Sequence, residues 1–348
     1  MQNQYIISTS FAVKEALEFI DNIGVPNMAL FVVDENHRLV GTVTDGDIRR
    51  GLIRGLKTND LVVEVMNVAF KFIIDGEDNF EKIEWFKQNG IRFVPVLNKD
   101  SYIIKLLDLE NIRSLIPVDV VLMAGGKGER LKSLTKNIPK PMLKVGDIPI
   151  IIRNMERLAN FGVTNFHLSI RHMAEQIVQG VSDYKIDNTL VNIVTEEKPL
   201  GTIGSIKLVK QFFNDTVLLM NSDLLTNIDF KDFYKKFIDL KCDMLVATVP
   251  FHVDVPYAVL NINEMEHLVS FSEKPRYTYY SNAGIYIFRK ELIELIPENI
   301  TFDATDFMEV LIMKKKTIGT YPILGYWLDI GRIDDYYKAQ EDVKNLKF

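Results

Sequence analysis

The sequence has little cysteine and no surplus of positive charge. Because it has one cysteine, Cys242, the chain cannot form an internal disulfide, as expected for a protein of the reducing cytoplasm. With 41 Lys and Arg against 47 Asp and Glu, the net charge of −6 argues against a nucleic-acid partner, because no cationic surplus is available to cover phosphates along a duplex.

Long hydrophobic runs and targeting features are also absent. Apolar runs such as residues 148–152 are far too short to span a bilayer. The N-terminus, Met-Gln-Asn-Gln-Tyr, has no basic region and leads into no continuous apolar segment, so no signal peptide is predicted. We expect a cytoplasmic protein, and its 348 residues are enough for two domains with a large buried core.

The most informative segment is an apolar strand that runs directly into a glycine-rich turn. Residues 120–131 read Val-Val-Leu-Met-Ala-Gly-Gly-Lys-Gly-Glu-Arg-Leu, and residues 139–142 read Pro-Lys-Pro-Met. Glycines let backbone N–H groups close around a phosphate, and Arg130 and Lys140 are the two cations that such a group needs. The spacing is not that of a Walker A loop. The third glycine of a dinucleotide fingerprint is missing, which argues against a nicotinamide-dependent dehydrogenase.

These residues resemble the signature of the sugar-1-phosphate nucleotidyltransferases, in particular of mannose-1-phosphate guanylyltransferase-like members. Five stretches between residue 119 and about residue 340 match the family in order. Strands and helices alternate over the same residues, with strands expected at 165–170, 191–194 and 217–220, which indicates an open α/β sheet. The resemblance implies a Rossmann-like mixed sheet and an enzyme that transfers a nucleotidyl group from an NTP to a sugar 1-phosphate, releasing pyrophosphate.

Base recognition is expected in the stretch 196–205, Glu-Glu-Lys-Pro-Leu-Gly-Thr-Ile-Gly-Ser, which is close to the family's Glu-x-Pro-Leu-Gly-Thr-Ala-Gly. A carboxylate suits guanine, whose N1–H and N2–H₂ groups are adjacent donors, so we expect GTP, with Glu197 preferred to Glu196 as the contact. Solvated glutamates in a surface loop, or a thymidylyl- or uridylyltransferase, are the alternatives. The nucleotide-binding residues that the resemblance implies are Ala124, Gly125, Gly126, Gly128, Glu196, Glu197, Gly201 and Thr202.

The remaining stretches carry two acids and a lysine. Asp223, at the end of an apolar strand, and Asp329 would hold Mg²⁺, which prefers oxygen ligands and keeps several waters. Lys274 would grip the phosphate of the sugar 1-phosphate. In the family's scheme Arg130 holds the β- and γ-phosphates and Lys140 stabilises charge on the α-phosphate. The catalytic residues implied are therefore Arg130, Lys140, Asp223, Lys274 and Asp329.

The resemblance also implies a sugar site, in which Glu273 and Asn282 would bond sugar hydroxyls. The sequence departs from the family's pattern in three places, one of which is residues 131–135, Leu-Lys-Ser-Leu-Thr, where the family often has a proline. Ser222 stands where relatives commonly have a glycine before the acid, and Ala258 stands where they usually have a glycine beside the sugar. We expect the extra methyl group of Ala258 to narrow the accepted pattern of hydroxyl or amine groups.

Residues 6–60 and 64–116 look like two copies of one unit, each with a helix, two strands and a further helix. They resemble a tandem CBS (Bateman) module, a regulatory unit that often binds adenine nucleotides. Thr44 and Asp47 match the residues that meet a ribose or phosphate there, although the same pair also reads as a helix-capping box. Because the second copy has Leu107 and Glu110 in their places, we expect an adenine or guanine nucleotide mainly at the first copy. Edge-to-edge dimerisation is the structural alternative.

The expected organisation is a CBS module at 1–117, a catalytic domain at 118–348, and a homo-oligomer. This domain order is similar to that of bacterial guanylyltransferases that activate glucosamine 1-phosphate or related sugars for nonulosonic (legionaminic) acid and surface-glycan synthesis. The product would be a GDP-sugar of the glucosamine or mannose type. A non-catalytic nucleotide-binding regulator on the same fold is the competing hypothesis, which the joint presence of all five catalytic residues disfavours.

Overall fold

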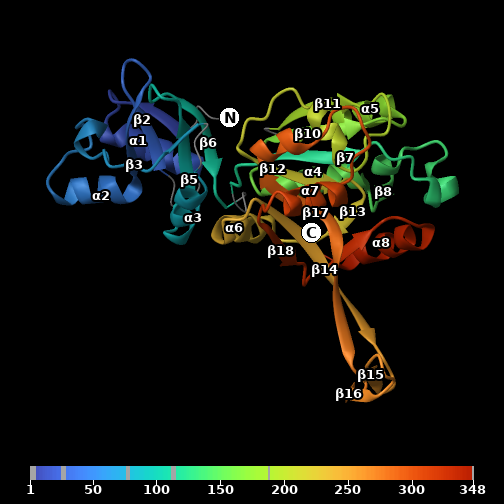
Figure 1. Cartoon of the computed structure of the whole chain (residues 1–348). Coiled ribbons are helices and arrows are strands. Elements are labelled where there is room, and N and C mark those ends of the chain that lie inside the picture. Colours follow the sequence, from blue (N-terminus) through green and yellow to red (C-terminus); the bar gives the residue numbers. More distant parts are fainter. Residues whose placement is uncertain (1–4, 25–28, 76–78, 111–114, 187–188, 347–348) are drawn as a thin grey trace. The chain divides into compact units, whose positions relative to one another are not determined.

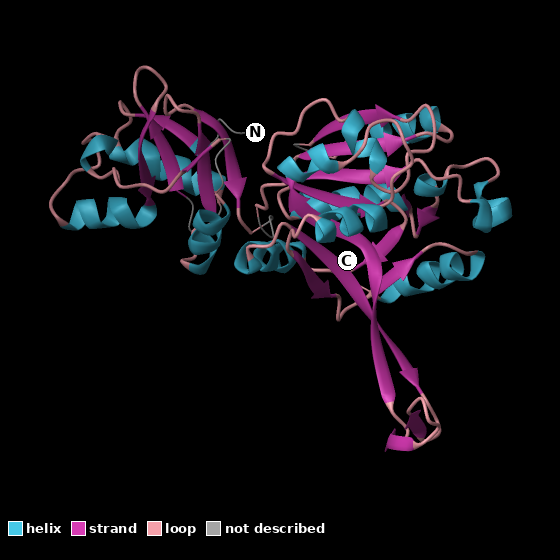
Figure 2. Ribbon diagram, viewed as in Figure 1, coloured by secondary structure: helices cyan, strands magenta, loops and turns pink. Residues whose placement is uncertain are grey.

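The computed structural model describes residues 5–24, 29–75, 79–110, 115–186 and 189–346. The chain divides into two compact units, Met1–Leu115 and Ile116–Phe348 (Figure 1). Both units combine helices with β-sheet (Figure 2). In the described part of the chain, no helix combines the length and the apolar character that crossing a membrane requires.

The first unit contains two three-stranded sheets of the same design. In each sheet the first strand is parallel to the second, and the second is antiparallel to the third. The elements of the first copy are β1 (Ile6–Ser8), α1 (Val13–Ile23), β2 (Ala29–Val33), β3 (Leu39–Thr44), α2 (Asp45–Ile53) and η2 (Val62–Glu64). Those of the second are β4 (Ile73–Ile74), α3 (Phe80–Gln88), β5 (Phe93–Leu97) and β6 (Ile103–Asp108).

The two sheets share an apolar cluster in which Phe31 and Leu39 of the first copy meet Leu97 of the second. The strand order repeats as the sequence predicted. One detail was wrong: the further helix expected in the second copy does not begin directly after its second strand, because β6 ends at Asp108 and residues 109–110 form a turn. Residues 111–114, which follow, lie outside the described residues.

The second unit is built on a seven-stranded sheet in the order β11-β10-β7-β12-β17-β14-β18. All neighbouring strands are parallel except for the two pairs that β17 makes, with β12 and with β14. The expected mixed sheet is therefore confirmed. Its strands are β7 (Asp119–Ala124), β10 (Asn165–Ile170), β11 (Leu190–Thr195), β12 (Thr216–Asn221), β14 (Met244–Asp254), β17 (Arg276–Arg289) and β18 (Ile318–Pro322).

Shorter elements surround this sheet. The small strands are β8 (Lys144–Val145), β9 (Ile148–Pro149), β13 (Leu224–Thr226), β15 (Val259–Ile262), β16 (Leu268–Ser272) and β19 (Trp327–Asp329). The α-helices are α4 (Ile150–Asn160), α5 (Ala174–Tyr184), α6 (Phe230–Leu240), α7 (Ala304–Met313) and α8 (Ile333–Asn345). The 3₁₀ helices are η3 (Glu129–Thr135), η4 (Lys140–Met142), η5 (Gly204–Leu208) and η6 (Lys290–Leu295).

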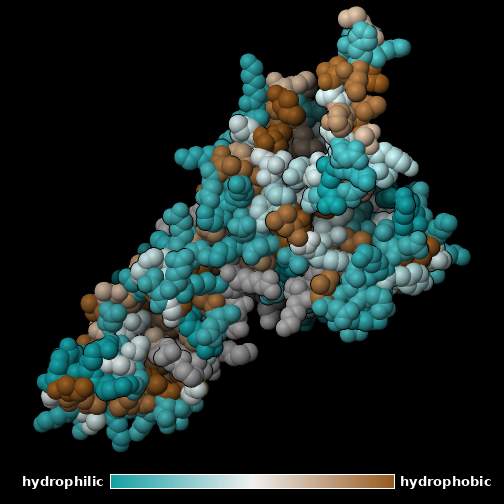
Figure 3. All heavy atoms as spheres, turned by 90° about the horizontal axis from the view of Figure 1, so that it is seen from below, coloured by the Kyte–Doolittle hydropathy of each residue, from teal (hydrophilic) through white to brown (hydrophobic). Residues whose placement is uncertain are grey.

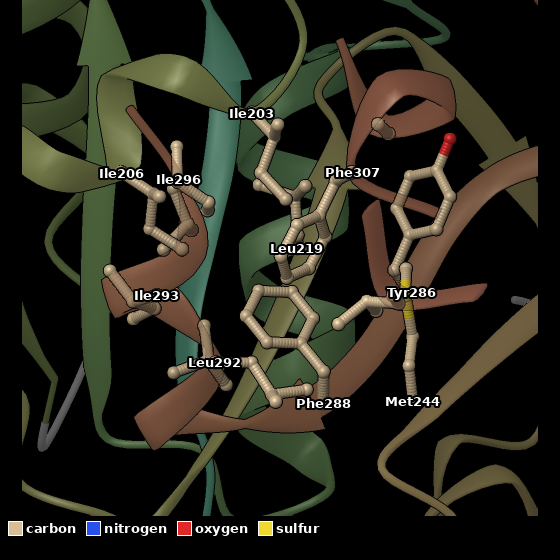
Figure 4. Close-up of a cluster of buried hydrophobic side chains, with 14 of the residues drawn as sticks. Ile203, Ile206, Leu219, Met244, Tyr286, Phe288, Leu292, Ile293, Ile296 and Phe307 are labelled. Atoms are coloured by element: carbon tan, nitrogen blue, oxygen red, sulfur yellow. The ribbon is translucent and has the colours of Figure 1, made fainter. Parts of the chain in front are cut away.

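The central strands are apolar along their length because both faces of the sheet are covered. On one face Val121 of β7 and Leu219 of β12 pack with Phe288 of β17 and Phe307 of α7 (Figure 4). The rings of Phe288 and Phe307 meet edge to face with centroids 5.5 Å apart. Helix α4 buries Ile151, Met155 and Leu158, whose helical spacing places them on one face.

Strands β14 and β17 continue beyond the sheet as a two-stranded ribbon. Their inner halves are buried, whereas their outer halves run from the pair Pro250 and Tyr280 to the pair Asp254 and Arg276. The β15–β16 hairpin lies at the far end of the ribbon (Figure 1). We call residues 250–280 the arm, and most side chains of the arm are exposed.

Candidate active site

The phosphate loop predicted from the sequence begins at the carboxyl end of β7, which is Ala124. Ligands collect at this edge of such sheets. The N–H groups of Gly126 and Lys127 have no partner among the described residues, so an anion can accept from them. Gly128 has a φ of 66°, and a Cβ there would lie 3.1 Å from Cβ of Lys140. The loop therefore packs directly against the lysine predicted to join it.

Asp223 and Asp329 come together because β13 and β19 pair with each other. The strands are antiparallel, with Leu224 opposite Asp329, and the N–H of Ile330 donates to the carbonyl of Asp223 at 3.1 Å. The Lys140 ammonium donates a hydrogen bond to the Asp223 carboxylate and lies 4.0 Å from the carboxylate of Asp329. Its side chain is only 12% exposed, so little water screens these charges.

Arg130 belongs to the same cluster. Its guanidinium lies 3.4 Å from the position that a Cβ on Gly331 would take, two residues beyond Asp329. Burial and the charge of Asp223 raise the pKa of Asp329, while Lys140 and Arg130 act against them. Four of the five predicted catalytic residues, two cations and two acids, thus share one site.

The two acids fit a divalent cation. Oδ1 of Asp223 is buried and has no hydrogen-bond partner among the described residues, whereas buried polar atoms ordinarily have one. A cation held by this oxygen and by Asp329 would satisfy it and offset the repulsion between the carboxylates. Nowhere in the described residues do three or more His, Cys, Asp or Glu side chains gather in a metal-binding group. Water and phosphate oxygens would supply the remaining ligands.

The backbone around Asp223 is held by a residue that the sequence analysis did not single out. Asn154 on α4 is 2% exposed, and its side-chain amide donates to the carbonyls of Ser222 and Leu224, at 3.2 and 3.0 Å. The hydroxyl of Ser222 donates to the carbonyl of Met123 on β7 at 2.7 Å. Ser222, a departure from the family's pattern, therefore ties Asp223 to the sheet. An asparagine on the buried side of a helix was the signal in the sequence that could have revealed Asn154.

Glu196 is buried beside the phosphate loop. Its carboxylate accepts from the Ser169 hydroxyl at 2.5 Å and from the N–H of Leu200 at 3.2 Å. It lies 2.8 Å from the position that a Cβ on Gly125 would take. Glu196 thus joins the stretch 196–205 to the sheet, whereas Glu197, the preferred base contact, is exposed.

Gly201 and Thr202 hold the same stretch against the start of α7. Gly201 has a φ of 80°, and a Cβ there would lie 2.5 Å from the carbonyl oxygen of Phe302. The N–H and hydroxyl of Thr202 donate to the Asp303 carboxylate at 2.8 and 3.1 Å, and the N–H of Ala304 donates to that hydroxyl at 2.9 Å. These polar groups of Thr202 are therefore engaged in shaping the loop.

Comparison with known proteins gives a family match in each unit. The model of the nucleotidyl transferase family matches residues 119–345. The chain belongs to this family. The model of the CBS domain matches residues 1–54. The family resemblance drawn from the sequence is thus confirmed, whereas a second CBS copy at 64–116 stays a prediction.

The curated relatives of this nucleotidyl transferase include mannose-1-phosphate guanyltransferase of Saccharomyces cerevisiae, 31% identical over 229 residues that cover 62% of each chain. Mannose-1-phosphate guanylyltransferase of Mycobacterium tuberculosis is 29% identical over 65% of this chain and 64% of its own length. The chain therefore spans less than two thirds of these relatives. The crystal structure of HddC from Yersinia pseudotuberculosis is 33% identical, with a TM-score of 0.52, over 65% of this chain and 99% of HddC. A second HddC structure is a complex with GMP-PN.

Of the predicted sugar-binding residues, Asn282 lies where the arm leaves the sheet. Its amide donates to the Tyr286 hydroxyl at 2.7 Å, and its carbonyl accepts from the N–H of Gly284 at 3.0 Å. A Cβ on Gly284 would lie 2.7 Å from the side-chain amide of Asn221, the last residue of β12. Gly284, two residues after Asn282, therefore lies against the end of the strand that leads to Asp223.

The other predicted sugar residues are not brought to the cluster. Glu273 and Lys274 are exposed between β16 and β17, and Ala258 is exposed between β14 and β15, so all three belong to the arm (Figure 1). The fifth predicted catalytic residue, Lys274, is thus separated from the other four. Its contact with the phosphate of the sugar 1-phosphate stays a prediction.

In the first unit, Thr44 and Asp47 form the capping box that begins α2. The Thr44 hydroxyl and N–H donate to the Asp47 carboxylate at 2.6 and 2.9 Å, and the same hydroxyl accepts from the N–H of Asp47 at 3.2 Å. The other oxygen of Asp47 pairs with Arg50 at 2.5 Å. Ligand binding by this pair stays a prediction, and a ligand would have to share these hydrogen bonds.

Proposed function

We propose that the chain is a Mg²⁺-dependent sugar-1-phosphate guanylyltransferase, which transfers GMP from GTP to a hexose or hexosamine 1-phosphate. The observation that carries the proposal is the position of Lys140, which meets Asp223 and Asp329 beside a phosphate loop with free N–H groups. The names of the curated relatives, and a complex of HddC with GMP-PN, support a guanine nucleotide.

In the proposed reaction a phosphate oxygen of the sugar 1-phosphate attacks the α-phosphorus of GTP. The new P–O bond forms as the bond from the α-phosphorus to the bridging oxygen breaks, and pyrophosphate leaves with that oxygen. Because the nucleophile is already anionic, no general base is needed, and catalysis consists of alignment and charge neutralisation. Lys140 would neutralise charge on the α-phosphate and Arg130 on the leaving pyrophosphate. Mg²⁺, held by Asp223 and Asp329, would add positive charge at the phosphate oxygens.

The preference for guanine rests on the pair Glu196 and Glu197. Glu196 is already hydrogen-bonded within the protein, whereas the exposed carboxylate of Glu197 has room to accept from the two adjacent donors of guanine. We therefore expect E197Q to raise KM for GTP more than it lowers kcat. The sugar we propose is of the glucosamine or mannose type.

The test is a matrix of four NTPs against a panel of hexose and hexosamine 1-phosphates, read by released pyrophosphate. We expect turnover with GTP and Mg²⁺ and none in D223A, while D239A, which changes an exposed aspartate on α6, keeps wild-type activity. Turnover with UTP or dTTP in place of GTP would contradict the assignment of the base. Absence of turnover in every combination would favour the non-catalytic regulator.

A second proposal concerns the first unit, where the CBS match covers Thr44 and Asp47. We propose that an adenine or guanine nucleotide binds at this pair and alters turnover. Titration of the full chain with AMP, ATP, GMP and GTP by calorimetry should give heat with at least one nucleotide in the wild type and less heat in D47A. A change in kcat or KM on adding the nucleotide is also required, since binding at a second site alone is not coupling.

A further inference from the structure

The arm separates one predicted catalytic residue from its site. Along β17, Arg276 is six positions from Asn282, which is roughly 20 Å at about 3.4 Å per residue of extended strand. Lys274 is two residues farther out. Its side chain is much shorter than this distance, so Lys274 does not reach the Lys140 cluster of its own chain.

The arm also exposes many large apolar side chains, which its own strands do not cover. Tyr257 is 75% exposed, Met265 74% and Phe271 64%. Figure 3, which looks at the molecule from the side of the arm, shows hydrophobic residues on this surface. A lone two-stranded ribbon is at best marginally stable in water, and large exposed apolar patches mark binding surfaces. Other exposed apolar residues of the arm are Phe251, Leu260, Ile262, Leu268, Val269, Tyr279 and Tyr280.

Both edges of the ribbon are open within the described residues. β18 pairs with β14 only as far as Thr248, and β12 pairs with β17 only from Ile285 onward. Lys274 itself has a φ of 43°, a left-handed conformation that a lysine rarely adopts. Such local strain gathers at functional sites, where the surroundings hold it in place.

We propose that the arm binds a second copy of this chain and places Lys274 and Glu273 in the sugar-phosphate site of that partner. The inference rests on the proposed function. Each copy has a cluster of Arg130, Lys140, Asp223 and Asp329 but holds its own Lys274 at the end of the arm. In a dimer, the arm of each copy would bring Lys274 to the cluster of the other copy. Each cluster would then receive the lysine that its own chain holds too far away. Reciprocal exchange of two arms closes with two-fold symmetry and covers the apolar surface of both.

The test is complementation between two inactive variants in a mixed dimer. D223A has a defective cluster and an intact arm, whereas K274A has an intact cluster and a defective arm. The two chains carry different tags, are co-expressed, and are purified through both tags. If the arm acts across the dimer, the mixed dimer has one complete site of two, and its turnover recovers to about half of the wild-type value. If Lys274 serves its own chain, the mixed dimer stays inactive, which overturns the proposal.

The matched control is a mixed dimer of D223A and D329A, in which both defects lie in the cluster, so neither arrangement restores turnover. Removal of residues 256–274, with a Gly-Gly turn in their place, should convert the dimer into a monomer by light scattering. A monomeric wild-type chain, or K274A with wild-type turnover, also overturns the proposal. If the wild type is inactive with every sugar 1-phosphate, the proposed function fails instead, and light scattering still decides whether the arm holds a dimer.

Discussion

The ammonium of Lys140 donates a hydrogen bond to the carboxylate of Asp223, a residue 83 positions later in the chain. The contact joins the segment after the phosphate loop to the turn after β12, and Asp329 stands 4.0 Å from the same ammonium. One cation therefore counters two partly buried acids. A divalent ion held between the two acids would offset their mutual repulsion.

The first prediction concerns this lysine. K140M removes the cation that the two acids share, so we expect the turnover of pyrophosphate release to fall by at least about a thousandfold. Without Mg²⁺ the variant should also unfold at a lower temperature than the wild type, and Mg²⁺ should restore more of its stability. K144M, which changes an exposed lysine on β8, is the matched control and should leave both measurements unchanged.

The second prediction uses the raised pKa of Asp329, which burial and the charge of Asp223 cause. A carboxyl whose pKa is higher in the folded state than in the unfolded state stabilises the fold when protonated. That contribution is lost as the pH rises from the ordinary aspartate range through the raised value. At pH 7 the ionised group is therefore destabilising, and D329N should unfold at a higher urea concentration than the wild type. We expect its free energy of unfolding to be higher by less than about 1 kcal/mol, because solvent screens this partly exposed group.

Three observations would support that reading of Asp329. The advantage of D329N should shrink as the pH is lowered toward 4. Mg²⁺ should stabilise the wild type but not D329N, which reverses the order of the two proteins. Pyrophosphate release should be lost in the variant. A wild type that is already more stable than D329N at pH 7 without metal would contradict the prediction.

The features of the fold that the sequence predicted correctly are those that local order determines. The glycine-rich turn, Gly125 to Gly128, directly follows the apolar strand β7, as the sequence indicated; phosphate binding by this turn stays a prediction. Asp223 follows the same logic at the end of β12. The helix positions on α4 follow from the 3.6-residue period, which burial of one face enforces.

The parts of the candidate site that the sequence did not predict depend on contacts between distant segments. The helical pattern places Asn154 on the buried side of α4, but it does not reveal that the partners of its amide are carbonyls 68 and 70 positions away. The motif around Lys274 predicted a phosphate contact, but β14 and β17 carry it outward on the arm. Motif order does not specify where in the fold each of these residues lies.

The third prediction concerns Asn154. N154A leaves two carbonyls beside Asp223 without a donor in a buried position, so we expect a loss of about 1–3 kcal/mol in the free energy of unfolding. The apparent affinity for the divalent metal should fall as well, because Asp223 is no longer fixed. N160A, at the exposed end of the same helix, should change neither quantity. Unaltered metal affinity in N154A would show that Asn154 serves only the core.

The fourth prediction tests the loop that carries the proposed base contact. G201A adds a Cβ that would lie 2.5 Å from the carbonyl oxygen of Phe302, at a φ of 80°. The left-handed backbone conformation alone costs an alanine about 1–2 kcal/mol of stability. The clash with Phe302 should cost more, because it pushes the loop away from α7. G90A separates the two effects, because Gly90 has a φ of 68° and nothing within 4 Å of its added Cβ. We expect calorimetry to show a larger loss of stability in G201A, together with a raised KM for GTP, since the displaced loop carries Glu197. Equal losses in the two variants, with KM unchanged, would mean that the contact between Gly201 and Phe302 does not shape the nucleotide site.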